Sequence, residues 1–554
     1  MSLLNKASLI QIPSGYKDGT LYSAKPTNGD GDFTFSRGSN LAATRVNSDG
    51  LIEKGRENLL LQSNQFDTTW SLTTSISITS GQSDKDGGTN AWLLKRADGS
   101  ARFIKQTISQ SGVQSFSVYI KAESTEWVYL FLGGTTSWAY FDLGSGSVGL
   151  TNSLIDSSIE AAGNGFYRCT ITASASTSEV RIYPAQSNGS VSGDSDNGVY
   201  IQSAQLELGL ISTPYIETGA STAQAGILED MPRLDYSGGA SCPSLLLEPQ
   251  RTNAIIDSEY FSGGWTKFGG STIEVGYQSP EGLNNAVKAT RGSNRTLMRS
   301  NNYATLSVNN VFSIYAKSGS INKISLDIGD EGETEFDLTD EWQRFDIVVN
   351  PSTYRFCDIS MPNSSLSGDY FYIYGAMLET SASYPTSYIP TYGASVTRGA
   401  DASSDSNVTP TSNKATLFIE ISGDDDSYSR NVCAFRNGTT NQYGLYFWGT
   451  DNNKFGFNSW QADSYGITNS TIFDGNIHKI AAVFDFTDFT TNTLFIDGVK
   501  QSISQVKGTT IQRTANKVSL IASQSNQNPR QNLHQFICFD SGLSDDECIQ
   551  LTTI

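Results

Sequence analysis

Three aromatic side chains towards the C-terminal end of the chain are the residues best suited to ligand chemistry. Tyr446, Trp448 and Trp460 fall in turn-rich sequence, and Trp460 is surrounded by polar residues in FNSWQADSYG. The flat face of an aromatic ring packs well against the apolar face of a pyranose, while a few polar groups orient the sugar. We therefore predict these three as glycan-binding residues. Packing of one sheet face is the alternative role for them.

Two other tryptophans, Trp70 and Trp265, could also stack on sugars. Each closes a segment that occurs twice in the chain. A tryptophan that ends a repeated strand-and-turn element is more simply explained by packing in the core or at the edge of a module. We expect core packing for both residues.

Catalytic signatures are scarce. The sequence contains no G-x-S-x-G, P-loop or HExxH motif, and both histidines, His478 and His534, lie beside strand-like segments where a hydrogen-bonded structural role is favoured. Glycoside hydrolysis needs two carboxylates about 5 to 9 Å apart in space, a distance that sequence does not give. We assign no catalytic residue and expect no enzyme, with a polysaccharide depolymerase as the alternative.

Acidic clusters in glycine-rich stretches could bind calcium, which prefers oxygen ligands. No cluster matches a complete EF-hand loop, and solvated turns often have this composition. The metal content stays unassigned: no cofactor is expected, and calcium is the one ion that these clusters could hold. The clusters are Asp30 with Asp32, Asp194 with Asp196, Asp327 with Asp330 and Glu331, and Asp424 to Asp426.

Charge and cysteine usage exclude several partners. The 37 basic and 56 acidic residues give a net charge of -19 with no basic cluster, so nucleic acid and anionic membranes are poor partners. No apolar run approaches the roughly 18 to 20 residues needed to span a bilayer, and the first residues lack a secretory signal. Six widely spaced cysteines without a CxxC pair predict buried free thiols, formed in a reducing cytoplasm.

A long internal repeat shows how the chain is organised. The segment RENLLLQSNQFDTTW at 56–70 returns 195 positions later as RTNAIIDSEYFSGGW at 251–265, without a gap. Later segments keep pace, and their alternation with period 2 predicts half-buried strands. They are SFSVYIKA with VFSIYAKS, FYRCTI with WQRFDI, and SAQLELGLISTPYIETGAS with GAMLETSASYPTSYIPTYGAS.

Each copy is therefore about 150 residues of short strands, which suits a jelly-roll β-sandwich. The second copy carries a longer lead-in, which we expect as a surface insert between modules, and the small polar stretch at 399–413 has the composition of a linker. An arginine followed two residues later by an asparagine opens both copies. We expect Arg56 and Arg251 to brace the junction between the lead-in and each sandwich.

The last part of the chain has a different pattern. TLFIEIS and HKIAAVFDF alternate as strands, and Asp497-Gly498 in TLFIDGVKQ predicts a type I′ hairpin turn. Ser544 and Glu547 have capping-box spacing, which predicts a short C-terminal helix. In this order, the His-led strand, the LFIDG hairpin and the final LSDDE resemble the laminin-G and concanavalin-A-like lectin superfamily. That resemblance implies a two-sheet sandwich that often binds carbohydrate.

The first 400 residues resemble structural proteins of tailed bacteriophages. The resemblance rests on FTFSRGSNLAATRVNSDGLIE, PRLDYSGGASCPSLLLEPQRTN, the SxxFxxxW element, and QLE or MLE followed by a Tyr-Ile pair. In such proteins these elements frame jelly rolls that resemble carbohydrate-binding modules, and laminin-G-like domains often follow. Head fibres, capsid decoration proteins and tail fibres all use these modules.

We therefore expect an all-β protein of tandem jelly-roll β-sandwiches with a C-terminal concanavalin A-like sandwich. The expected order is a lead-in or anchoring segment at 1–55, a first jelly roll at 56–222, an insert at 223–250, a second jelly roll at 251–398, a linker at 399–413 and the lectin-like domain at 414–554.

The expected function follows from the resemblances. The chain would be a virion component assembled in the host cytoplasm, a head-fibre or capsid-decoration appendage that displays glycan-binding modules for adhesion. A tail fibre or receptor-binding protein, the depolymerase and a scaffold that binds no sugar are the alternatives. Expected partners are other copies of the chain as a dimer or trimer, capsid or tail proteins and host surface glycans.

Overall fold

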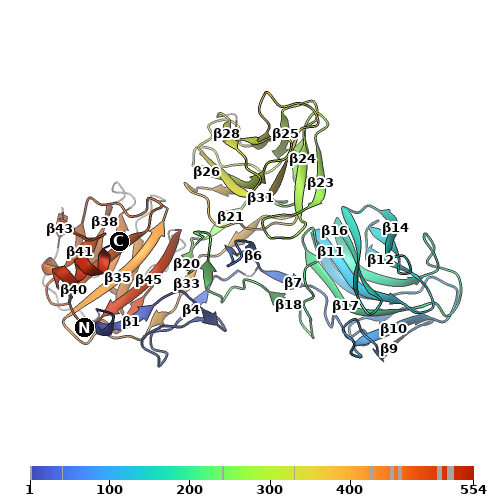
Figure 1. Ribbon diagram of the computed structural model, residues 1–554, viewed down its shortest axis with the longest axis horizontal. Helices are drawn as coiled ribbons and strands as arrows, with labels where there is room; N and C mark the ends of the chain where they lie inside the picture. Colours follow the sequence, from blue (N-terminus) through green and yellow to red (C-terminus); the bar gives the residue numbers. More distant parts are fainter. Residues whose placement is uncertain are drawn as a thin grey trace.

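The computed structural model forms three β-sandwich lobes around a central junction (Figure 1). The fold is all-β, as the sequence predicted, and consists of tandem jelly rolls with a third, C-terminal sandwich. The structure describes residues 3–39, 41–239, 242–329, 331–424, 430–438, 440–448, 454–459, 464–503, 505–507, 514–520 and 530–553.

The first sandwich is built around two long strands, β11 (Ile104–Ala122) and β16 (Phe166–Ala185), which pair along most of their length. The start of β11 pairs with β8 and its second half with β17, while β16 pairs with β15 at its start and with β12 at its end, so both strands serve both layers of the sandwich. Their inward residues share one core. The other strands are β8 (Ser71–Leu72), β9 (Ile76–Gln82), β10 (Ala91–Arg96), β12 (Trp127–Gly133), β13 (Trp138–Asp142), β14 (Ser147–Asn152), β15 (Asp156–Gly163) and β17 (Gly198–Leu208).

The second sandwich repeats this plan with shorter strands, so that its two layers are separate sheets. One sheet has the order β22 (Trp265–Lys267), β25 (Thr296–Ser300), β30 (Cys357–Ser360), β27 (Lys323–Ile328) and β28 (Thr334–Asp337). The other has the order β23 (Thr272–Tyr277), β24 (Ala286–Thr290), β31 (Tyr370–Thr380), β26 (Asn310–Lys317) and β29 (Gln343–Val349). Apolar residues of both sheets form a single core between them.

The third sandwich contains residues from both ends of the chain. One sheet consists of β19 (Arg233–Asp235), β20 (Ser244–Leu247), β45 (Gln531–Phe539), β35 (Lys414–Gly423), β40 (His478–Asp485), β41 (Thr493–Ile496) and β42 (Val499–Lys500), with β1 (Ala7–Gln11) also on β45. The facing sheet consists of β34 (Asp405–Ser406), β44 (Lys517–Ser519), β36 (Arg430–Asn437), β37 (Thr440–Trp448), β38 (Lys454–Ser459), β39 (Ser464–Ile467) and β43 (Gln505–Lys507). The short helices are α1 (Leu3–Lys6), η1 (Phe489–Thr491) and α2 (Asp545–Thr552).

The two segments expected outside the sandwiches, 1–55 and 223–250, contribute strands to the third one. Leu9 of β1 pairs with Cys538, and Leu245 of β20 pairs with Leu533, so both segments complete the same edge of the sheet. Leu245 and Leu247 are buried in its core. The expectation of a surface insert was wrong, because the apolar run SLLL covers an edge strand whose backbone groups would otherwise lack partners.

The stretch at 399–413 is not a free linker either. It runs along the junction, where β33 (Ala402–Ser403) pairs with β4 (Phe33–Ser36) and β34 joins the third sandwich. The remaining short strands at the junction are β2 (Tyr16–Lys17), β3 (Thr20–Leu21), β5 (Thr44–Val46), β6 (Ile52–Lys54), β7 (Arg56–Asn58), β18 (Ala223–Ala225), β21 (Arg251–Asn253) and β32 (Val396–Arg398).

The repeated opening segment connects the entry of each sandwich to its closing strand. Asn58 donates to the carbonyls of Ala204 and Ile216, and Asn253 donates in the same way to Ala376 and Ile389. The hydroxyl of Ser63 lies 2.6 Å from that of Tyr215, and Ser258 repeats this contact with Tyr388. Trp70 and Trp265 are 5% and 4% exposed and belong to the two cores. The repeat is thus a structural closure.

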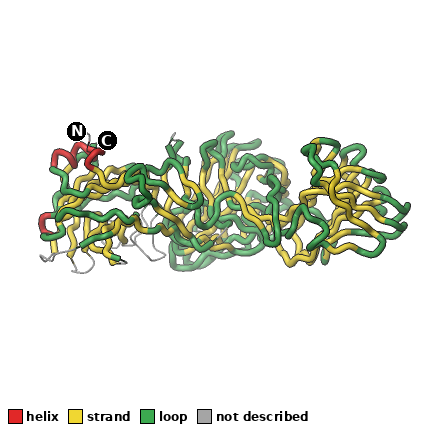
Figure 2. The backbone as a smooth tube through the Cα atoms, turned by 90° about the horizontal axis from the view of Figure 1, so that it is seen from below, coloured by secondary structure: helices red, strands yellow, loops and turns green. Residues whose placement is uncertain are grey.

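Several local predictions for the third sandwich are confirmed. Asp497 and Gly498, between β41 and β42, both have positive φ, as a type I′ turn requires. Ser544 and Glu547 form the predicted capping box of α2. Among the described residues, helix occurs in the lobe that holds both chain ends (Figure 2). No helix among the described residues is long and apolar enough to cross a membrane.

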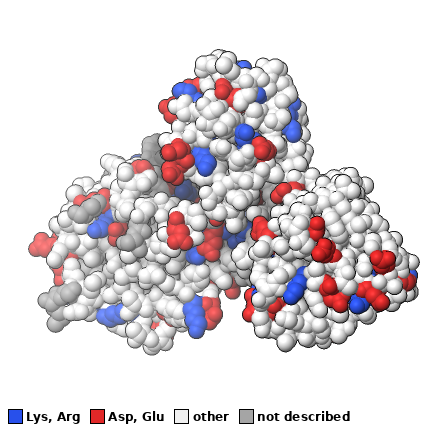
Figure 3. All heavy atoms as spheres, turned by 45° about the vertical axis from the view of Figure 1, so that its right-hand side comes forward, with Lys and Arg blue, Asp and Glu red and all other residues white. Residues whose placement is uncertain are grey.

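All six cysteines are free, as expected. Five are buried, but Cys242 is exposed, so the expectation of burial was wrong for that thiol. Figure 3 shows acidic and basic side chains interspersed over the visible face, without a continuous basic area.

Candidate ligand-binding surfaces

The structure does not test the three predicted glycan-binding residues. Tyr446 is half-buried within β37, where it pairs with Gly456 of β38. Trp448 ends the same strand, but its side chain lies outside the described residues, as does the whole of Trp460. A glycan site built from these residues stays a prediction.

The first sandwich presents an aromatic cluster on the outer side of one layer, which we call the aromatic face. Side chains alternate along β12, so that Val128, Leu130 and Leu132 enter the core while Tyr129 and Phe131 point the other way. The neighbouring strands add more rings on the same side. The aromatic face consists of Phe103, Tyr129, Phe131, Trp138, Tyr140 and Tyr183.

The rings of the aromatic face pack against one another and keep part of their surface open. Tyr129 is at the centre, with ring centroids 4.6 Å from Tyr140, 5.1 Å from Tyr183 and 5.6 Å from Trp138. Tyr129, Phe131 and Trp138 are half-buried. Burial raises the pKa of the Tyr129 hydroxyl, so the phenol is neutral at ordinary pH.

Charged groups border the aromatic face on one side. The guanidinium of Arg181 lies over the rings of Phe103 and Phe131, 4.6 and 5.2 Å from their centroids. Glu179 forms ion pairs with Arg181 and, at 2.7 Å, with Lys105. Burial opposes ionisation of Glu179, but the hydrogen bonds from Lys105 and Arg181 lower its pKa overall. The border therefore offers fixed charges and hydrogen-bonding groups beside an aromatic platform.

The second sandwich provides an internal comparison for this face. The pairs Leu130 with Ile182 and Leu326 with Ile359 occupy equivalent inward positions of β12–β16 and β27–β30. Four outward positions of these strands and their neighbours differ in character between the copies. Tyr129, Phe131, Tyr183 and Tyr140 of the first copy correspond to Ser325, Asp327, Ser360 and Glu335 of the second.

A fold that needed aromatic residues on this side would need them in both copies. The second copy forms the same layer with serine and carboxylate side chains at these positions. The rings of the first copy are therefore not a requirement of the fold. Partly exposed aromatic clusters of this kind are typical of binding surfaces.

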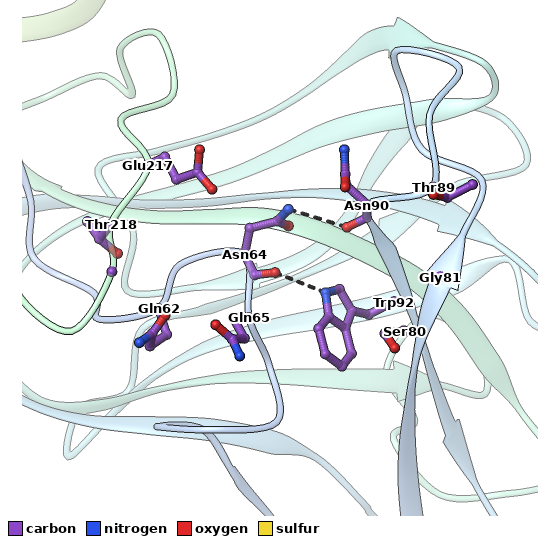
Figure 4. Close-up of a pocket in the computed structure, with 11 residues that line it drawn as sticks. Gln62, Asn64, Gln65, Ser80, Gly81, Thr89, Asn90, Trp92, Glu217 and Thr218 are labelled. Atoms are coloured by element: carbon purple, nitrogen blue, oxygen red, sulfur yellow. Dashed lines mark hydrogen bonds between the residues drawn. The ribbon is translucent and has the colours of Figure 1, made fainter.

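A second surface of the first sandwich is a cavity of about 610 Å³, which we call the polar pocket (Figure 4). Trp92 of β10 and Ser80 of β9 lie on one side of it, and Gln62 and Thr218 on the other (Figure 4). The lining is dominated by amide and hydroxyl side chains. It consists of Gln62, Asn64, Gln65, Ser80, Gly81, Thr89, Asn90, Trp92, Glu217, Thr218 and Gly219.

Hydrogen bonds hold the inner wall of the polar pocket in place. The indole N–H of Trp92 donates to the carbonyl of Asn64 at 2.9 Å, which orients the ring. The side chain of Asn64 accepts from the backbone N–H of Ser203 at 2.8 Å and donates to the carbonyl of Asn90. A preformed wall of this kind loses little conformational entropy when a ligand binds.

Two clusters of buried charges connect the lobes. In the first, Lys54 contacts Glu259 at 2.5 Å and Glu281 at 2.6 Å, and Arg56 pairs with Glu281 at 2.6 Å. Arg56 thus links the start of the first copy to the second sandwich, whereas we expected it to brace the lead-in against the first. Arg251 is 3.7 Å from Glu379, lies over the ring of Tyr384 and donates to the carbonyl of Gln250.

The second cluster, which we call the junction network, joins the lead-in, the segment at 223–250, the end of the second copy and the stretch at 399–413. Arg233 and Arg398 flank Glu248 at 2.7 and 2.9 Å, while Asp401 accepts from Arg233 and from Arg37. All five side chains are at most 2% exposed. Such burial and pairing is structural, because no ligand reaches these groups.

The histidines have hydrogen-bonded positions in the third sandwich. His478 lies between Asp497 at 2.7 Å and Asp474 at 3.1 Å, and His534 is 3.3 Å from the hydroxyl of Ser422. Burial alone would lower the pKa of His478, but the hydrogen bonds to Asp497 and Asp474 raise it overall.

Several carboxylates of the acidic clusters already have partners within the protein. Asp32 accepts from Ser23, Asp194 from Gln186, and Asp424 pairs with Arg530. Asp330, Asp425 and Asp426 lie outside the described residues. Within the described part of the chain, no group of three His, Cys, Asp or Glu side chains is arranged to hold a metal ion.

The chain matches no protein-family model, and no curated protein matches it. Among solved structures it is similar to the N-terminal CBM22-1-CBM22-2 tandem domain of Xyn10C from Paenibacillus barcinonensis, with 9% identity, a TM-score of 0.20, and coverage of 62% of this chain and 99% of that one.

Two further similar structures have low scores as well. Trypanosoma rangeli sialidase in complex with the inhibitor DANA shares 10% identity, with a TM-score of 0.21 and coverage of 93% and 98%. The tandem CBM51 modules of a family 98 glycoside hydrolase from Streptococcus pneumoniae share 10% identity, with a TM-score of 0.16 and coverage of 63% and 99%. Similarity at this level carries no conclusion about ligand or activity, so the function must be argued from the surfaces themselves.

Proposed function

We propose that the chain is a non-enzymatic structural protein of a tailed-phage virion, of the head-fibre or capsid-decoration type, that binds glycans through its first sandwich. The observation that carries glycan binding is the aromatic face, whose rings are replaced by Ser325, Asp327 and Ser360 at the equivalent positions of the second sandwich. The virion role rests on the sequence resemblance to phage structural proteins.

The chemistry of the aromatic face suits a saccharide. Half-buried rings offer apolar surface for the C–H face of a sugar, and the bordering Arg181, Glu179 and Lys105 offer hydrogen bonds to hydroxyl groups. A single shallow site of this kind binds weakly. Several copies of the chain on one particle, as a dimer or trimer attached to capsid or tail proteins, would raise the apparent affinity.

Two features support binding without cleavage. Glycoside hydrolysis uses two carboxylates flanking the bond, whereas the border of the aromatic face offers Glu179 alone, already paired with two cations. The lining of the polar pocket contains one carboxylate, that of Glu217. The proposal requires no cofactor, no nucleic acid and no membrane insertion, and it places the protein on the virion after assembly in the host cytoplasm.

The junction supports a role in display. Buried ion pairs and shared strands connect the second and third sandwiches, while the pair of Arg56 with Glu281 and the hydrogen bond from the Val113 N–H to the Tyr392 carbonyl connect the first sandwich to the second. The three sandwiches would then be held in fixed orientations rather than on flexible linkers. A rigid arrangement presents the aromatic face in one direction from the particle.

Binding can be tested with the full chain displayed multivalently on a glycan array that includes polysaccharides of the host surface. We expect signal on a subset of glycans, and we expect no new reducing ends when the protein is incubated with those glycans. A blank array would favour the scaffold without sugar binding, and product formation would favour the depolymerase.

The virion role has a separate test. Antibody labelling of intact particles, read by electron microscopy, is expected to mark the capsid surface. Labelling of the tail would reassign the protein as a tail fibre or receptor-binding protein. Particles without any label would overturn the virion role.

A further inference from the structure

The polar pocket of the first sandwich lies where the second sandwich holds a side chain of its own polypeptide. Three of its lining residues, Asn64, Asn90 and Gly219, correspond in the repeat to Glu259, Asn285 and Tyr392. The equivalence is structural as well as sequential. The backbone N–H of Thr218, next to Gly219, donates to the hydroxyl of Ser63, and the N–H of Thr391, next to Tyr392, donates in the same way to Ser258.

In the second sandwich this position is filled by Lys54 from the lead-in strand β6. Its ammonium contacts Glu259 at 2.5 Å, Glu281 at 2.6 Å and the hydroxyl of Tyr392 at 2.7 Å, and its side chain is 3% exposed. Burial alone would lower the pKa of Lys54, but the two carboxylates raise it overall, so the lysine is charged. In the second sandwich, the ammonium group of Lys54 therefore occupies the position that is open in the first.

In the first sandwich the groups that hold the cation are missing. Asn64 stands in place of Glu259, and Asp86, the counterpart of Glu281, is 71% exposed and paired with Lys85. Gly219 stands in place of Tyr392, which leaves open the space that the tyrosine ring fills in the other copy. The pocket is therefore open, and it lacks the two buried carboxylates that hold the ammonium group in the second copy.

The groups that replace them suit a neutral ligand rich in hydroxyl groups. Trp92 takes the position of Val287 and adds an indole ring to the wall, while Gln62 and Gln65 contribute amides. Glu217 is the one charged residue of the lining, so an acidic sugar would meet repulsion and no basic partner there. A cavity of about 610 Å³ lies within the usual range of small-molecule sites, roughly 300 to 1,000 Å³.

From these replacements we infer that the polar pocket binds the end of a neutral glycan, one or two sugar units, with Trp92 as the stacking surface. The inference shares its ligand class with the proposed function but uses a different site. The first sandwich would then hold a glycan at two places, an extended platform and an end-binding pocket.

The test gives the pocket the tyrosine of the second copy. Gly219→Tyr introduces the counterpart of Tyr392, whose hydroxyl contacts Lys54 in the other sandwich, and a Cβ at Gly219 meets no atom within 4 Å. Gly238→Tyr is the matched control, because its Cβ is equally free and it lies outside the polar pocket. Thermal unfolding of both variants verifies that they are folded.

Binding to the full chain is measured by saturation-transfer NMR with glucose, galactose, mannose and N-acetylglucosamine, and with glucuronic acid and glucosamine as charged probes. We expect transfer to at least one neutral sugar, at least tenfold weaker binding in Gly219→Tyr, and unchanged binding in Gly238→Tyr. Neutral sugars that bind none of the proteins, that bind Gly219→Tyr undiminished, or that bind no better than the charged probes would overturn the inference. Loss of sugar binding in the aromatic-face variant Tyr129→Ser, with binding retained in Gly219→Tyr, would place the sugar on the aromatic face instead.

Discussion

Removing the carboxylate of Glu248 is predicted to weaken the junction far more than removing any surface charge. Glu248 is fully buried, accepts two hydrogen bonds from Ser387 and lies between Arg233 and Arg398. Glu248→Gln keeps the shape of the side chain but leaves Arg37, Arg233 and Arg398 with Asp401 as the one carboxylate of the junction network. Breaking a buried pair by removing one partner costs about 3–5 kcal/mol, because the remaining charge is uncompensated.

The matched control is Glu335→Gln in the second sandwich. Glu335 pairs with Lys323 at 2.6 Å, yet the two side chains are 43% and 39% exposed, and an exposed pair of this kind contributes about 0–1 kcal/mol. The assay is hydrogen exchange at increasing urea, read by mass spectrometry on peptides that contain β20 and β32. These peptides report local opening of the junction, which a global unfolding curve of a three-lobed chain would not resolve.

We expect the free energy of opening at β20 and β32 to fall by about 3–5 kcal/mol in Glu248→Gln and by less than about 1 kcal/mol in Glu335→Gln. Burial opposes ionisation of Glu248, but Arg398 and Arg233 hold its pKa well below the usual range. Its contribution should therefore be complete above about pH 4.3 and decline as the pH falls below that value. A loss under about 1 kcal/mol in Glu248→Gln would refute the view that the network holds the lobes together.

Four other variants and probes test separate parts of the structure. Trp70→Ala should destabilise the first sandwich by about 3–5 kcal/mol in calorimetry, and an unchanged transition would contradict its place in the core. His478 has a raised pKa in the folded protein, so its stabilising contribution should be present below about pH 6.5 and vanish as the pH rises through that raised pKa. A difference in melting temperature between the native protein and His478→Gln that grows with pH would contradict this. Cys242 should be the one thiol that reacts rapidly with a disulfide reagent in the native protein, and rapid reaction of a second thiol would show that a core is open. Arg56→Ala should cost more stability than Arg251→Ala, since Arg56 is 2.6 Å from a carboxylate and Arg251 is 3.7 Å from one; equal losses would show that the closer pair contributes nothing.

Much of the fold could be predicted because local patterns and the repeat agree. Alternation in SFSVYIKA and VFSIYAKS placed the strands, and the Asp497-Gly498 turn and the Ser544 cap have geometries that few residue types allow. The position of SLLLEPQ in the sheet of the third sandwich could not be predicted in this way. Its leucines pair with β45, nearly 300 residues away, and no local signal distinguishes an edge strand from an insert.

The aromatic face and the polar pocket could not be predicted, because each is formed by residues that are far apart in the sequence. Trp70 and Trp265 were weighed as sugar-stacking residues and expected in the core, where the structure places them. Tyr129 and Phe131 alternate with leucines in WVYLFLG, which is the ordinary pattern of a strand. Their significance emerges only when the register aligns them with Ser325 and Asp327 of the second copy.

The central claim, that the aromatic face of the first sandwich binds glycan, is tested most directly by giving it the side chains of its own repeat. In the full chain, Tyr129→Ser with Phe131→Asp reproduces outward residues that the second sandwich already accommodates. For a glycan identified on the array, titration calorimetry should show at least tenfold weaker binding, about 1.4 kcal/mol or more, with an unchanged melting temperature. Binding equal to that of the native protein would contradict the claim.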